Sequence, residues 1–111
     1  MNWNQLTTVE QLQAIKEESF NQPVLIFKHS TRCSISSTAL SRVERNWKQE
    51  AVGELKPYYL DLIANRPVSN AIVEEFGVEH QSPQVILIKD GTSVYDASHF
   101  DIRFEEIAET V

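Results

Sequence analysis

The sequence predicts an α/β protein in which a mixed sheet of about four strands is flanked by helices. Two continuous apolar runs, at residues 24–27 and 85–88, are typical of strands buried on both faces. Between them, apolar residues recur at spacings of three and four, which indicates amphipathic helices. The predicted element order is α-β-α-β-α-β-β-α, within a single domain that spans residues 1–111.

The first half of the chain predicts a helix, a strand, a second helix and a second strand. Thr8 and Gln11 have the spacing of a capping box, and the helix that they start extends to about Phe20. The run at 24–27 is the first strand, and the aromatic and aliphatic segment 58–62 is the second. The helix between these strands has three apolar residues on one face: Leu40, Val43 and Trp47.

The second half predicts a third helix, a β-hairpin and a last helix. Pro67 suits the first position of the third helix, and Gly77 suits the left-handed residue that ends it. Asp90 and Gly91 predict a tight turn between the strand at 85–88 and a second hairpin strand. Asp101 is the expected cap of the last helix. The apolar residues expected to pack that helix on the sheet are Ile102, Ile107 and Val111.

Composition excludes several classes of function. The net charge is −6, with sixteen acidic and ten basic residues, so neither nucleic acid nor an anionic membrane is an expected partner. No apolar run reaches the length of a membrane span or of a secretory signal, and a lone reduced cysteine suits the cytoplasm. Three scattered histidines and one cysteine do not form a metal set, so we expect no metal. We expect a monomer or a weak dimer.

Cys33, the only cysteine, lies between the first strand and the helix that follows it. A thiol at a helix start faces unpaired backbone N–H groups and the positive end of the helix dipole, which both favour the thiolate. Free cysteines are commonly buried as small hydrophobes, but the neighbours here are polar: Arg32, Ser34 and Ser36. Because position 36 holds serine, Cys33 has no internal partner and must exchange with the sulfur of another molecule.

Two separated segments, 27–36 and 76–84, resemble the YtxJ-type monothiol bacilliredoxins, and nearly the whole chain resembles thioredoxin-like proteins. Members of that family carry a Cys-Pro-Ile-Ser active site, whereas this chain has Ser34 in the proline position. The replacement keeps the nucleophile but removes the fixed φ that proline gives to a helix start. The redox potential is the property that this departure affects.

The resemblance implies that Cys33 removes bacillithiol, or a similar low-molecular-weight thiol, from mixed disulfides on client proteins. The small thiol is then a co-substrate, and no bound cofactor is required. The resemblance also implies a cis peptide bond between Ser82 and Pro83, which places the Ser82 backbone beside Cys33 to pair with an extended substrate.

Roles follow for the residues around the thiol. Cys33 is the expected nucleophile, and Ser36, one helical turn later, is the expected hydrogen-bond donor to its thiolate. Arg32 is expected to attract carboxylates of a small-thiol adduct or, alternatively, to be a solvated surface charge. The Ser34 hydroxyl is a further donor. His29 either tunes Cys33 electrostatically or bonds to the backbone.

Two other functions remain as alternatives. In the first, the chain is a non-catalytic binding module, and the surface around Pro83 recognises a peptide by strand addition. In the second, Cys33 is a redox sensor that forms an intermolecular disulfide.

Overall fold

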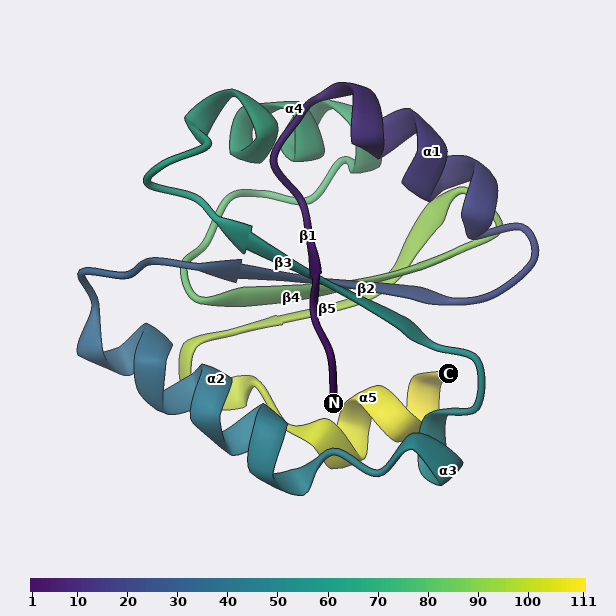
Figure 1. Ribbon diagram of the computed structural model, residues 1–111, viewed down its shortest axis with the longest axis vertical. Coiled ribbons are helices and arrows are strands. Elements are labelled where there is room, and N and C mark those ends of the chain that lie inside the picture. The colour runs from purple at the N-terminus through teal and green to yellow at the C-terminus, as the bar shows by residue number, and fades with distance from the viewer.

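A computed structural model describes all 111 residues. Its core is a five-stranded sheet with the strand order β1-β3-β2-β4-β5 (Figure 1). The predicted α/β class with a mixed sheet is therefore confirmed, with one strand more than expected. The strands are β1 (Asn4–Gln5), β2 (Val24–His29), β3 (Lys56–Asp61), β4 (Gln84–Lys89) and β5 (Thr92–Ser98).

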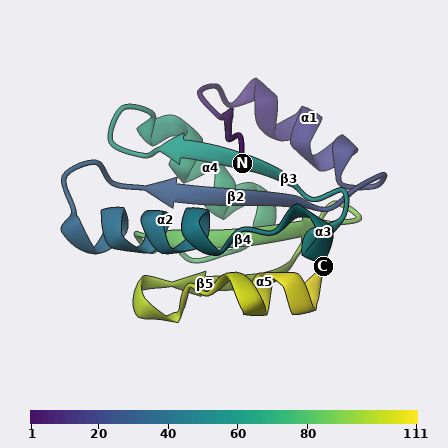
Figure 2. The ribbon, with the colours of Figure 1, turned by 60° about the horizontal axis from the view of Figure 1, so that its bottom comes forward.

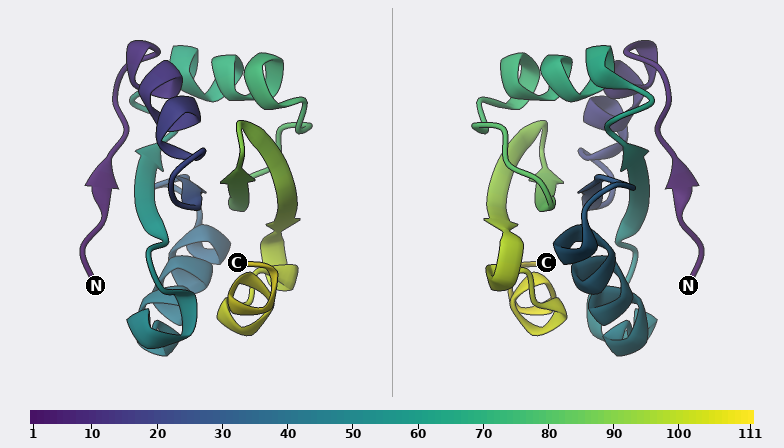
Figure 3. Two further views of the ribbon diagram at one scale, coloured as in Figure 1. Left: turned by 90° about the vertical axis from the view of Figure 1, so that its right-hand side faces the viewer. Right: turned by 90° about the vertical axis from the view of Figure 1, so that its left-hand side faces the viewer.

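Helices cover both faces of the sheet, as the views from three sides agree (Figures 1, 2 and 3). Two helices lie on one face, and three helices and a short 3₁₀ turn lie toward the other. The helices of the first face are α1 (Glu10–Glu18) and α4 (Arg66–Phe76). Those of the second are α2 (Ser34–Asn46), α3 (Gln49–Val52) and α5 (Phe104–Thr110), with the 3₁₀ turn η1 (His99–Asp101) beside them.

An apolar core lies between each face of the sheet and the helices that cover it. β2 contributes to both cores because its side chains alternate between the faces. Ile26 belongs to the core under α1 and α4. Phe27 belongs to the core under α2, α3 and α5. By the same alternation, Lys28 lies on the α4 side and His29 on the α2 side, so the last two residues of β2 serve different layers.

The sheet register brings the ends of three strands, β2, β3 and β4, to one end of the sheet. β2 and β3 are parallel and pair His29 with Asp61 at their carboxyl ends, while β4 runs antiparallel to β2 and pairs Gln84 with Lys28. Pro83, the residue before β4, therefore lies level with His29. In Figure 2, β2 leads through a short loop into α2. Cys33 is the residue before α2, so it follows the carboxyl end of β2 at this same end of the sheet. Ligands of open α/β sheets bind at such carboxyl ends.

Local signals in the sequence account for several element ends. The capping box is present, because the Thr8 N–H donates to Gln11 Oε1 at 3.0 Å and the Gln11 N–H donates to Thr8 Oγ1 at 3.3 Å. Gly77 ends α4 with a left-handed φ of 67°. The turn between β4 and β5 has positive φ at both central residues, 53° at Asp90 and 79° at Gly91, as a type I′ hairpin turn requires.

Three expectations need correction. Strand β1 was not predicted, because its two residues are polar and exposed; its place is fixed instead by the neighbouring Leu6, whose N–H donates to Tyr59 O at 2.9 Å. Helix α3 has four residues, too few for a periodic pattern. Asp101 does not cap α5, since it belongs to η1 and the last helix begins only at Phe104.

Candidate thiol-exchange site

Cys33 is the N-cap residue of α2, with the extended backbone angles φ −114° and ψ 119°. Its C=O accepts the first helical hydrogen bond, from Ser37 N–H at 3.1 Å, and its own N–H donates to Ser30 O at 3.2 Å. No side chain caps the helix. The N–H groups of residues 34–36 consequently have no acceptor in the protein, and they belong to the helix start at which Cys33 is the cap. The residue is half-buried, so an attacking partner can reach it.

Ser36 is fully buried and bonds away from Cys33. Its Oγ lies 2.7 Å from Nδ1 of His29 and accepts the Ser30 N–H at 3.1 Å. No hydrogen bond joins Ser36 to Cys33, because the hydroxyl has two other partners at the end of β2 and in the loop that follows it. A donation from Ser36 to the thiolate stays a prediction.

The His29 side chain bonds neither to the backbone nor to Cys33, so its contact with the Ser36 hydroxyl is a role that the sequence did not reveal. The ring lies between two aromatic neighbours, with centroid distances of 6.3 Å to Phe27 and 5.6 Å to Tyr59. Burial lowers the pKa of His29, and the negative charges of Asp61 and Glu44 oppose this shift only in part.

A second buried basic residue was also missed. Lys28 is fully buried, and its Nζ lies 2.7 Å from Nδ1 of His80, in the loop that leads to Pro83. Burial lowers the pKa of Lys28 to about 8. The neighbouring cations Lys28 and Arg66 join burial in lowering the pKa of His80. The only signal in the sequence for this buried lysine was its position directly after the apolar run of the strand.

The peptide bond between Ser82 and Pro83 is cis, as predicted. The carbonyl of Pro83 accepts the His99 N–H at 3.0 Å, which joins it to η1. Ser82 makes no backbone hydrogen bond, and its buried hydroxyl has no partner. Its N–H and C=O are thus without a backbone partner, just before the strand end that pairs with the carboxyl end of β2.

Arg32 and Ser34 flank the thiol and are both exposed. Neither forms a salt bridge or a side-chain hydrogen bond within the protein, since the two ion pairs of the molecule involve other residues. Ser34 is the first residue of α2, at the place expected for the family's proline. The structure therefore brings both residues to the site without giving either a structural partner.

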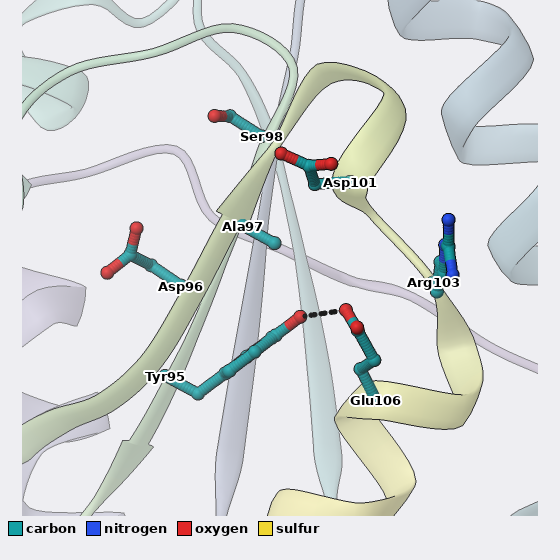
Figure 4. A pocket seen from close by; sticks show the side chains of 7 residues that line it. All are labelled: Tyr95, Asp96, Ala97, Ser98, Asp101, Arg103 and Glu106. Carbon is teal, nitrogen blue, oxygen red and sulfur yellow. Dashed lines mark hydrogen bonds between the residues drawn. The ribbon is translucent and has the colours of Figure 1, made fainter.

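The hollow in Figure 4 is separate from this site. It lies between β5 and α5 and is lined by Tyr95, Asp96, Ala97, Ser98, Asp101, Arg103 and Glu106. Its main internal contact is structural: Tyr95 donates its phenolic hydrogen to Glu106 at 2.9 Å, and burial together with this carboxylate raises the pKa of Tyr95. None of the residues predicted for thiol chemistry lines it or any other pocket, and Cys33 is half-buried outside all of them.

No three histidine, cysteine, aspartate or glutamate side chains gather where a metal ion could be held. None of the helices has the length and apolar character that crossing a membrane requires.

Solved structures similar to this chain share its fold over nearly their whole length. One, described as a candidate oxidoreductase with a thioredoxin fold, is 28% identical with a TM-score of 0.81, and the match covers 96% of this chain and 90% of that one. Thioredoxin from Malassezia sympodialis is 14% identical with a TM-score of 0.73, covering 97% and 86% of the two chains. Thioredoxin from Fasciola hepatica is 19% identical with a TM-score of 0.70, covering 96% and 94%.

The fold, with a half-buried cysteine at the start of α2 and a cis proline before β4, defines a thioredoxin-fold thiol oxidoreductase. The family model described as monothiol bacilliredoxin BrxC matches residues 4–107. The chain belongs to this family, and the resemblance noted in the sequence is confirmed.

Proposed function

We propose that this protein removes bacillithiol, or a similar low-molecular-weight thiol, from mixed disulfides on client proteins. The single observation that carries the proposal is the placement of Cys33, half-buried at the N-cap of α2, in a chain with no second cysteine. Membership of the monothiol bacilliredoxin family supports bacillithiol as the small thiol.

The reaction is a thiol–disulfide exchange that leaves the total number of disulfides unchanged. The Cys33 thiolate attacks the sulfur of the small thiol, forms a new S–S bond to it, and breaks its bond to the client. The client sulfur leaves as a thiolate and takes a proton from solvent. A second small thiol then attacks the adduct, releases Cys33 and carries the disulfide away.

The surroundings of Cys33 support both halves of this exchange. The free N–H groups of residues 34–36 stabilise negative charge on the sulfur while it attacks and when it leaves again. The unpaired backbone groups of Ser82 offer a short edge to which an extended client segment binds. A half-buried thiol that lies outside any pocket suits a substrate that is itself a protein.

Incubation with a bacillithiolated model protein tests the proposal, followed by mass spectrometry under non-reducing conditions. We expect release of the client and a one-to-one bacillithiol adduct on the wild type, and neither with Cys33→Ala. A parallel incubation with the glutathionylated client compares the two small thiols. Client release without a Cys33 adduct contradicts the mechanism, a covalent dimer points to a redox sensor, and tight peptide binding without exchange points to a binding module.

A further inference from the structure

His29, the last residue of β2, and Ser36, in the first turn of α2, form a buried hydrogen bond behind the thiol. Their side-chain atoms Nδ1 and Oγ are 2.7 Å apart, and the Ser30 N–H donates to the same Oγ at 3.1 Å. His29 is 5% exposed and Ser36 is 0% exposed. This pair joins the sheet to the helix that begins at Cys33.

The hydroxyl of Ser36 has a single hydrogen, and its oxygen already accepts one hydrogen bond from Ser30 N–H. When Nδ1 of His29 carries no proton, the hydroxyl hydrogen must lie in the bond to the ring. When Nδ1 is protonated, the ring donates to Ser36 Oγ, and the hydroxyl hydrogen leaves this bond. Cys33 lies three residues before Ser36, at the N-cap of the same helix, and no hydrogen bond joins the two side chains in this structure.

We propose that His29 is a positioning residue for Cys33: its protonation state decides whether the Ser36 hydroxyl hydrogen is held by the imidazole or is donated to the Cys33 sulfur. This inference rests on the proposed exchange at Cys33. In the uncharged ring with its proton on Nε2, the thiolate is stabilised by the backbone N–H groups of α2 alone. In the charged state, it gains the hydroxyl as an additional donor.

The groups around the imidazole set the pH at which this change occurs. Tyr59 and Asp61 face it from β3, and Glu44 is the carboxylate that acts on it from α2, which also carries Cys33. Burial lowers the pKa of His29 more than the two carboxylates raise it. The ring is therefore uncharged near neutral pH, where the tautomer with its proton on Nε2 holds the hydroxyl hydrogen, and release of that hydrogen is expected on the acid side of the ordinary histidine range.

The rate at which iodoacetamide alkylates Cys33, measured against pH on the full chain, tests the inference without any mixed disulfide. We expect a second step in the wild-type profile, of about threefold or more, at the pH where the His29 ring titrates by NMR. Ser36→Ala keeps the ring but removes the hydroxyl, and His29→Asn keeps a polar side chain that does not titrate. Both variants should lose the step. Ser69→Ala, which changes a buried serine in α4, should keep it.

Two results overturn the inference. A step that persists in Ser36→Ala shows that the imidazole charge acts on Cys33 directly. A wild-type profile with a single ionisation, while the NMR signal of His29 titrates, shows that the two groups are not coupled. If His29→Asn does not fold, as circular dichroism would show, Ser36→Ala alone decides. A wild type that keeps the alkylation step but does not release a bacillithiolated client refutes the proposed function and not this coupling.

Discussion

The ammonium of Lys28 lies 2.7 Å from Nδ1 of His80, and this contact joins a fully buried strand position to the loop that leads to Pro83. The Lys28 ammonium has three hydrogens to donate, and this is its only hydrogen bond within the protein. His80 is exposed and can be hydrated, whereas the Lys28 ammonium is buried and has no access to water. The lysine is thus kept at a cost in stability, next to the residues that precede β4.

Replacing Lys28 with methionine should stabilise the protein near neutral pH. The pKa of Lys28 falls from 10.5 in the unfolded chain to about 8 in the fold, so the charged form is disfavoured by about 3 kcal/mol at most. Below pH 8 both states are charged and the full penalty is present. Between pH 8 and 10.5 the unfolded state binds more protons, so wild-type stability rises with pH through this group.

Urea unfolding at pH 7 and at pH 9.5 measures this effect. We expect Lys28→Met to exceed the wild type by about 1–3 kcal/mol at pH 7, and by clearly less at pH 9.5. Lys16→Met is the matched control, because Lys16 is partly exposed and pairs with Glu75 at the surface. A difference between Lys28→Met and wild type that does not vary with pH would contradict the expected link to the lysine.

Ser82→Ala should leave stability unchanged or raise it by up to about 1 kcal/mol, because the hydroxyl that it removes is buried without a partner. Ser36→Ala provides the contrast: it deletes a buried hydroxyl with two partners and should cost about 1–3 kcal/mol. Chemical unfolding of both variants checks the ordering. Equal losses in the two would show that Ser82 has a partner in solution.

The elements that the sequence predicted are those whose signals are local. The apolar run before Cys33 indicated β2, and Asp90 and Gly91 indicated the hairpin turn, because each pattern depends on few neighbouring residues. Strand β1 could not be found this way, since its two polar residues become a strand only by pairing with β3. The four-residue helix α3 is likewise too short to show a periodic pattern, and its place depends on the packing of Val52 in the core.

The same division applies to the site. The place of Cys33 was predictable because a cysteine among polar residues, between a strand and a helix, is a local pattern. The cis bond before Pro83 followed from the family resemblance. The partners of Ser36 and Lys28 were not predictable. His29 and Ser36 are seven residues apart and Lys28 and His80 are fifty-two apart, so only the folded chain shows which side chains meet.

Restoring proline at position 34 should stabilise α2. Cys33 already has the extended angles φ −114° and ψ 119° that a residue before proline prefers, and the N–H that Ser34 would lose has no acceptor. Ser34→Pro is therefore expected to raise the free energy of unfolding by about 0.4–1 kcal/mol. Ser37→Pro is the control, and it should destabilise by about 3 kcal/mol because the Ser37 N–H donates to Cys33 O. A loss of stability with Ser34→Pro would contradict this account.

Neutralising Arg32 should slow exchange with small disulfides that carry carboxylates. The side chain is exposed beside Cys33 and has no ion-pair partner in the protein, so its charge is free to attract an anionic adduct. We expect Arg32→Gln to lower the rate about two- to fivefold at low salt, with a smaller effect at high salt, where the attraction is screened. Alkylation by neutral iodoacetamide should change much less. Arg45→Gln, in the last turn of α2, removes the same charge far from the thiol and should leave both rates unchanged. If Arg32→Gln and Arg45→Gln slow the exchange equally, net charge and not the position of Arg32 governs the encounter.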